Sequence, residues 1–269
     1  MENWPNTHTK INFLIMGLLT ILFFAPAFAD EDTEEIIESV TIIGSAEDLR
    51  KLAGSGQVIS NDDLLKAMDT DIQKILTAVP GIYMRTEEGY GLRPNISIRG
   101  TAIERSAKVA IMEDGVLVAP SPYTSSSAYY FPTTGRIHSV EVLKGPAAVS
   151  QGPQTIGGAI NLISTPIPSS TSGKFIQELG ENGMMRTHAY YGGTSGNFGA
   201  LVEVHEHESD GFDSIANVGG DTGFNKSDLV FKARYESGAH SLTLKMVDLD
   251  EISNQSYVGL SQASFNANP

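Results

Sequence analysis

Side chains that could perform covalent chemistry are sparse in this chain. It contains no cysteine, which excludes thiolate nucleophiles and thiolate metal sites. Its serine, histidine and aspartate residues are scattered, and no serine lies in the Gly-x-Ser-x-Gly elbow of a hydrolase. Gly54-Ser55-Gly56 lacks the third glycine of the dinucleotide fingerprint, and Lys144 precedes its glycine where a P-loop needs the reverse order. The sequence therefore predicts no enzyme and no nucleotide site.

One histidine pair could bind a metal ion. His205 and His207 lie two residues apart in a segment expected to be a strand, so both imidazoles point to one side, with Glu203 and Glu206 beside them. A closed metal site needs more ligands than this pair provides. We interpret the pair as part of a polar strand face and predict no metal.

Cationic side chains gather in and after one loop. The stretch from Tyr83 to Pro94 is rich in glycine, charge and tyrosine, which is typical of an exposed connection. Arg85 and Arg93 lie in it, and Arg99 and Arg105 follow. A guanidinium offers a planar fork that matches carboxylates, so these arginines are candidate anion contacts. Exposed loop charges are more often simply solvated.

The elements that position this loop are a helix and several short strands. Ser60 with Asp63, and Thr70 with Gln73, have the capping-box spacing of helix starts. After Thr70 a helical apolar stripe ends at Pro80-Gly81; it consists of Ile72, Ile75, Leu76 and Val79. β-Branched runs closed by glycine or proline predict a small mixed sheet with tight turns; they span residues 92–100, 111–116, 140–146 and 157–162.

Two details of that region are specific. Asp114-Gly115 predicts a type I′ hairpin turn, because both positions must adopt a positive φ. The loop at 120–132 carries Tyr129, Tyr130 and Phe131; we expect Phe131 to pack in the core and leave the tyrosines open as packing or pocket residues.

The N-terminus has the pattern of an export signal. Lys10, the apolar run from Ile11 to Phe24 and Ala27-Phe28-Ala29 predict a signal peptide over residues 1–29, cleaved before Asp30. The acidic stretch from Asp30 to Glu38 follows and should remain extended. The net charge of -14 argues against nucleic acid as a partner.

The C-terminal region, residues 169–269, has the alternation of half-buried strands. Apolar residues alternate with polar ones over 228–236 and 241–246, and weaker segments lie at 174–181, 184–193 and 198–208, which makes about five strands. One face suits lipid and the other water. A soluble β-sandwich would show a similar pattern.

The order and spacing of these motifs resemble TonB-dependent outer-membrane receptors, the gated barrels of Gram-negative bacteria. Leu92-Arg93-Pro94 before Ile98-Arg99-Gly100, and Ala119 to Tyr123 after Asp114-Gly115, look most like the ferric dicitrate branch. The resemblance implies an α+β plug domain over residues 47–168. The N-terminal antiparallel strands of a transmembrane β-barrel follow, incomplete in this chain because such barrels have about 22 strands.

The resemblance also implies partners and sites. Within the 30–46 tether, Ser39, Val40, Thr41, Ile42 and Ile43 correspond to the TonB box, which pairs edge to edge with TonB; the alternative is a first strand of the plug sheet. A ferric chelate, rather than a cofactor, would contact plug-apex residues, namely Arg99, Thr86, Arg93, Arg85 and Tyr90. Arg99 could instead form a plug–barrel ion pair with Glu141.

These implications predict an outer-membrane receptor that contacts lipid and is energised through TonB. Two alternatives of other classes remain at this point. The chain could be a soluble periplasmic binding or signalling module, or an inert receptor fragment, because a barrel that cannot close cannot insert.

Overall fold

The computed structural model describes residue 43 and residues 54–67, 70–87, 89–118, 130–215, 220–254 and 261–267. The chain divides into units 1–34 and 35–269, and all described residues belong to the second unit. The predicted signal peptide, the tether up to Ile42 and Tyr129 lie outside the described residues. Within the described part, no helix is long and apolar enough to cross a bilayer.

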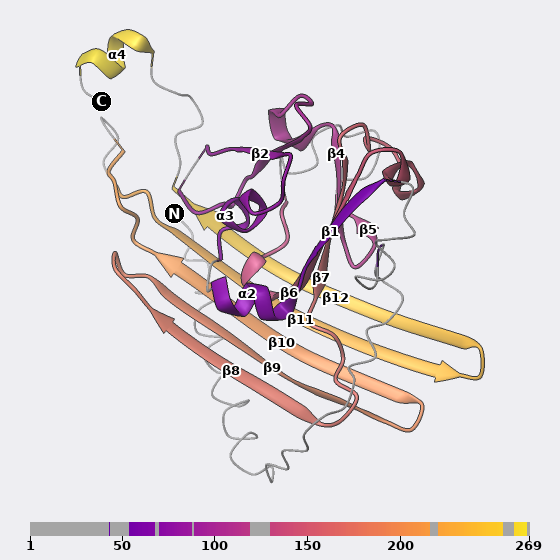
Figure 1. Ribbon diagram of the computed structural model, residues 1–269. Coiled ribbons are helices and arrows are strands. Elements are labelled where there is room, and N and C mark those ends of the chain that lie inside the picture. Colours follow the sequence, from indigo (N-terminus) through magenta and orange to yellow (C-terminus); the bar gives the residue numbers. More distant parts are fainter. Residues whose placement is uncertain are drawn as a thin grey trace, which may run out of the picture. The chain divides into compact units, whose positions relative to one another are not determined.

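A five-stranded mixed sheet forms the centre of the first domain (Figure 1). In this sheet β4 and β7 pair in parallel, and the other three neighbouring pairs of strands are antiparallel. The predicted type I′ turn is confirmed, since Asp114 and Gly115 have φ values of 51° and 77°. In spatial order the strands are β1 (Ser55–Ile59), β6 (Ile137–Lys144), β7 (Gly158–Ser164), β4 (Val109–Glu113) and β5 (Val116–Leu117).

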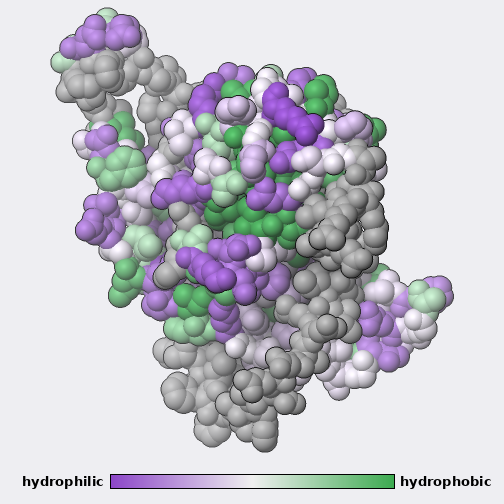
Figure 2. All heavy atoms as spheres, in the orientation of Figure 1, coloured by the Kyte–Doolittle hydropathy of each residue, from purple (hydrophilic) through white to green (hydrophobic). Residues whose placement is uncertain are grey.

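Both faces of this sheet are covered, because successive side chains of a strand point to opposite sides. On β6, Val140 and Val142 join the larger apolar core, whereas Leu143 joins a smaller core on the other face. Phe131 is 2% exposed within the larger core, which confirms its predicted packing. Figure 2 shows hydrophilic groups over much of the visible domain surface, with hydrophobic groups between them.

Two short helices and a hairpin accompany the larger core. Helix α2 (Asn61–Ala67) starts with the predicted capping box, in which Ser60 and Asp63 exchange hydrogen bonds of 3.1 and 3.2 Å. Helix α3 (Ile72–Thr77) buries the predicted stripe, but its cap is Asp71 rather than Thr70. The Asp71 carboxylate accepts the Gln73 N–H at 2.8 Å because it stands next to the first turn. The hairpin is β2 (Ile82–Arg85) with β3 (Asn95–Ile98).

The C-terminal region forms a second sheet of five antiparallel strands, as predicted. They pair in chain order and lie side by side in Figure 1; they are β8 (Ser172–Leu179), β9 (Met185–Ser195), β10 (Phe198–Ser209), β11 (Phe224–Ser237) and β12 (His240–Ser253). The other helices of the described residues are short, namely η2 (Glu104–Ser106), η3 (Thr134–Arg136), η4 (Pro146–Gln151) and α4 (Gln262–Ala267).

The second sheet has one polar and one apolar face. Strand β12 is the clearest case, because Leu242, Leu244 and Met246 are 71%, 53% and 60% exposed on one face. Lys245, between them in sequence, points the other way and contacts the first domain. The alternation predicted from the sequence is therefore present, with the polar face toward the first domain.

Candidate functional site

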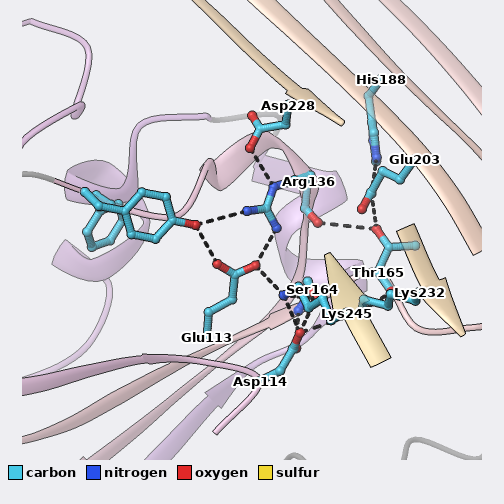
Figure 3. A network of polar contacts seen from close by, with 12 residues as sticks. Glu113, Asp114, Arg136, Ser164, Thr165, His188, Glu203, Asp228, Lys232 and Lys245 are labelled. Carbon is cyan, nitrogen blue, oxygen red and sulfur yellow. Dashed lines mark hydrogen bonds and ion pairs between the residues drawn. The ribbon is translucent and has the colours of Figure 1, made fainter. Parts of the chain in front are cut away.

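The polar face of the second sheet meets the first domain through a buried arginine. Arg136 ends η3, just before β6, and is 0% exposed. Its Nη1 donates to Glu113 Oε1 at 2.6 Å and its Nε to Asp228 Oδ1 at 3.1 Å. Figure 3 shows the guanidinium between these carboxylates, one from β4 and one from β11. Burial opposes the arginine's charge, but the two carboxylates outweigh it and raise the pKa of Arg136.

A lysine of β12 makes the second bridge between the domains. Lys245 Nζ donates to Glu113 Oε1 and Asp114 Oδ2, both at 2.5 Å, and to Ser164 Oγ at 3.0 Å. Lys232 of β11 donates to the Thr165 carbonyl at 2.7 Å. The tight β4–β5 turn thus presents adjacent carboxylates to cations from two strands of the second sheet.

These cations set the charge state of the turn. Burial favours the neutral carboxyls, yet Arg136 and Lys245 together lower the pKa of Glu113 to about 2. For Asp114, Lys232 and Lys245 likewise overcome burial and lower its pKa to about 2. Both groups are therefore ionised at neutral pH and hold the contact.

Acid should loosen this contact. The folded-state pKa values of Glu113 and Asp114 lie below their ordinary values of 4.5 and 3.8, so the unfolded chain binds more protons in this range. Their contribution is complete above about pH 5 and is lost as the pH falls toward about 2. We expect the urea midpoint of unfolding to fall across that window. In Lys245→Met the folded-state pKa values should move back toward the ordinary ones, so the fall should be smaller and should end at a higher pH. A midpoint independent of pH in the parent protein would contradict the assignment.

A third contact centres on Glu203 of β10. Its Oε1 accepts Thr165 Oγ1 at 2.5 Å and meets His188 Nε2 at 2.7 Å (Figure 3). His205 is fully buried next to it, and a Cβ on Gly135 would lie 2.2 Å from His205 Nε2, so only glycine fits there. Among the described residues, no group of three or more acidic, histidine or cysteine side chains is arranged to hold a metal ion.

A cavity of about 460 Å³ borders the interface. It lies between the β4–β5 hairpin and strands β11 and β12, and its walls are largely apolar. Lys232 and Lys245 line it, but both are engaged with Asp114. The cavity therefore presents no unpaired lysine to an anion.

The structure places the predicted apex residues in different environments. Arg85 is held by Glu104 through bonds of 2.9 and 2.7 Å, and Arg93 pairs with Glu251 of β12 at 2.6 Å. Thr86 is exposed. Tyr90 is half-buried against Phe212 and Phe224, with ring centroids 5.7 and 4.6 Å away. The loop is thus anchored to the ends of the second sheet rather than free.

Arg99 and Glu141 do not form the predicted ion pair. Arg99 follows β3 with a positive φ of 56° and is exposed near Lys144, whose pKa is lowered by burial and by the Arg99 charge. Glu141 is 1% exposed on the opposite face of the first sheet, because β3 packs on the Val140 side. Ion pairs between the domains instead join Arg136 to Asp228, Lys245 to Glu113 and Asp114, Lys232 to Asp114, and Arg93 to Glu251.

Glu141 contacts the one described residue of the predicted TonB box. The Ile43 N–H donates to Glu141 Oε1 at 3.2 Å, and Ile43 is buried. Residues Ser39 to Ile42 lie outside the described part of the chain.

Sequence reasoning missed the interface residues themselves. Asp228 and Lys232 were recognised only as members of a polar strand face, and Asp114 only as a turn residue. The sequence around Arg136 gave no indication of its role, because no local pattern there shows that the side chain is buried.

The fold and site define a class: a small α+β domain docked by buried charges on the polar face of antiparallel strands whose other face is apolar. Residues 48–159 match the TonB-dependent receptor plug domain family. The solved ferric citrate transporter FecA, unliganded, aligns with a TM-score of 0.68 and 22% identity over 87% of this chain and 36% of that one. The siderophore receptor PirA of Acinetobacter baumannii aligns with a TM-score of 0.61 and 20% identity over 78% and 34% of the chains.

Two curated relatives agree with this class. The vitamin B12 transporter BtuB of Photobacterium profundum is 24% identical over 78% of this chain and 37% of its own length. The iron-regulated outer membrane virulence protein of Vibrio cholerae serotype O1 is 31% identical over 58% of this chain and 24% of its own. The chain thus spans between about a quarter and little more than a third of the length of these two relatives. The family match covers residues 48–159, and three of these four similar proteins are named as transporters or receptors, while the fourth is named as an outer membrane virulence protein.

Proposed function

We propose that this chain provides the plug and N-terminal barrel strands of a TonB-dependent outer-membrane receptor for a ferric chelate, with ferric citrate as the specific candidate. The observation that carries the proposal is the buried Arg136 bridge, which docks a domain matching the plug family on the polar face of five strands. Because the first domain covers the polar face of the second sheet, the apolar face of that sheet is left to contact lipid.

The strands would then belong to a barrel wall. A sheet of five strands has two edges with unpaired backbone groups, which hydrocarbon does not tolerate, so closure needs further strands, about 22 in all for a plugged barrel. In this proposal residues 1–29 are the export signal, 30–46 the tether with the TonB box, 47–168 the plug and 169–269 the first part of the wall.

Arg99 is our candidate for chelate binding among the predicted apex arginines. Arg85 and Arg93 pair with the carboxylates of Glu104 and Glu251, whereas Arg99 is exposed and lies near another cation, Lys144. A guanidinium suits the carboxylates of an iron–citrate chelate. One similar protein is named for ferric citrate and another for vitamin B12, so the names of the relatives do not select one ligand. Titration of this protein with each ligand makes that choice. A ligand can shift the tether between its docked and released states only if it binds the receptor more tightly in one of these states than in the other.

TonB binding tests the proposal. Strand addition uses the backbone N–H groups of the box, and proline has none. Val40→Pro in the full chain, held in outer-membrane vesicles, should therefore lower the affinity for the soluble periplasmic domain of TonB by about tenfold or more. The measurement is titration of the vesicles with labelled TonB domain.

Thr41→Val is the matched control, since it keeps the N–H and the β-branched shape. Adding ferric citrate should raise the affinity of the parent chain for TonB, whereas cobalamin should not; the reverse would reassign the ligand. If the mature chain appears in the soluble periplasmic fraction and binds no TonB domain, the soluble-module alternative holds.

A further inference from the structure

Glu141 is a carboxylate buried in the middle of the plug sheet. It lies on β6, opposite Val58 of β1 and Asn161 of β7, and is 1% exposed. Its face of the sheet is otherwise mainly apolar, with Met112 and Leu143 nearby. A buried carboxylate is unfavourable unless hydrogen-bond donors reach it, so its donors indicate what the group does.

Two donors to Glu141 lie among the described residues, one in the sheet and one at the end of the tether. Asn161 Nδ2 donates to Glu141 Oε2 at 3.0 Å, and the Ile43 N–H donates to Oε1 at 3.2 Å. The amide of Asn161 is fixed in this orientation, because its Oδ1 accepts the Gly115 N–H at 2.9 Å. Turning the amide over would place its oxygen against the carboxylate.

Ile43 has a second attachment through its side chain. It is 5% exposed and belongs to the smaller core, where it packs with Met112, Leu143 and three alanines, Ala110, Ala148 and Ala159. The small alanine side chains leave room for the isoleucine. Ile43 is therefore held both by a hydrogen bond to its backbone and by burial of its side chain.

We propose that Glu141 is a latch for the segment that leads into the plug, with Asn161 as its positioning residue. The inference rests on the proposed function in taking this segment as the one that TonB pulls. The carboxylate suits a releasable contact, because water can replace the Ile43 donor when the segment leaves, whereas Asn161 stays in place. The sheet itself need not rearrange.

The latch ends at the turn that contacts the barrel strands. Asn161 bonds Gly115, and the preceding residue Asp114 accepts hydrogen bonds from the Ser164 hydroxyl and from Lys245, each at 2.5 Å. Hydrogen bonds, joined by the covalent backbone between Asp114 and Gly115, thus connect Ile43 to β12. Docking of the tether and docking of the plug share this turn.

The first test measures release of the tether without any partner. The chain has no cysteine, so a nitroxide on Thr41→Cys reports this segment alone. In the full chain in lipid vesicles, Ile43→Pro, which removes the donor, and Glu141→Gln, which places an amide against Asn161, should each raise the ratio of mobile to immobile label about tenfold. Ile43→Pro also removes the Ile43 side chain from the smaller core, whereas Glu141→Gln leaves it in place. A rise in both variants therefore assigns the release to the hydrogen bond that they share.

Two variants separate the latch from general loosening. Ile43→Val keeps the N–H and most of the side chain, and Asp63→Asn alters another plug carboxylate that accepts a backbone N–H, that of Ser60 at 3.1 Å. Both should leave the ratio of mobile to immobile label within about twofold of the parent. An unchanged ratio in Ile43→Pro, or an equal rise in Ile43→Val, overturns the latch.

A second arm distinguishes this inference from the proposed function. If the latch restrains the TonB box, release should raise the affinity for the soluble TonB domain by the same factor as the label ratio. Ile43 is the last residue of the predicted box, so Glu141→Gln is the variant for this arm. Release of the label with no TonB binding by parent or variant would overturn the proposed function and leave the latch standing.

Discussion

Replacing Arg136 with methionine should lower the free energy of unfolding by roughly 3–5 kcal/mol, because it breaks a buried ion pair by removing one partner. Glu113 and Asp228 would remain buried, and each would lose a charged hydrogen bond, of 2.6 and 3.1 Å respectively. Arg136→Lys should recover only part of the loss, since an ammonium lacks the fork that reaches two carboxylates from different elements. Urea unfolding of the full chain in lipid vesicles measures the change.

Burial, rather than the number of hydrogen bonds, should account for this effect. Arg85 makes two bonds to Glu104 with similar lengths but at an exposed site, so Arg85→Met should change stability far less. Replacing Arg136, Glu113 and Asp228 together by Met, Leu and Leu should restore much of the loss, since no carboxylate is then left buried without its arginine and Lys245 still pairs with Asp114. Equal effects of the Arg136 and Arg85 variants would contradict the buried bridge.

Leu244→Lys should destabilise the membrane-bound chain by roughly 2–4 kcal/mol, the cost of a lysine on the lipid face of a barrel strand near the bilayer midplane. Leu244 is 53% exposed on the apolar face of β12, away from the plug. In a soluble protein the same change would replace an exposed apolar side chain by a charged one and should be close to neutral. The size of the effect therefore separates a membrane wall from a soluble sandwich.

The neighbouring Thr243 is the matched control, because it lies at nearly the same depth but lines the cavity on the plug side. Thr243→Lys should destabilise the protein less than Leu244→Lys in urea unfolding from vesicles. If Leu244→Lys leaves the unfolding midpoint unchanged and the chain remains in the soluble fraction, the apolar face is not in contact with lipid.

The anchored apex loop bears on how ligand and tether could communicate. Tyr90 packs against Phe224 at the start of β11, and Arg93 pairs with Glu251 of β12. The turn at Asp114, where the latch ends, contacts the same two strands through Lys232 and Lys245. Strands β11 and β12 therefore touch both the loop predicted to contact ligand and the turn that holds Asn161.

Local patterns in the sequence determined most of the secondary structure. Asp114-Gly115 specified a hairpin because positive φ at both residues is a property of the two residues themselves. The stripe from Ile72 to Val79 specified one buried helix face, and period-two alternation specified the five strands. These features depend on neighbours within a few positions, so they can be predicted without the fold.

Only the tertiary structure decided which charged residues meet. Arg136 finds Glu113 across 23 positions and Asp228 across 92, while Glu141 receives the Ile43 N–H across 98. The expected pairing of Arg99 with Glu141 failed because packing of β3 put the two residues on opposite faces of the plug sheet. A charge can be paired by any opposite charge that packing brings near, and burial then selects and strengthens that pair. Residue type and spacing therefore identify the groups able to form buried contacts, and the packing of plug against strands chooses their partners.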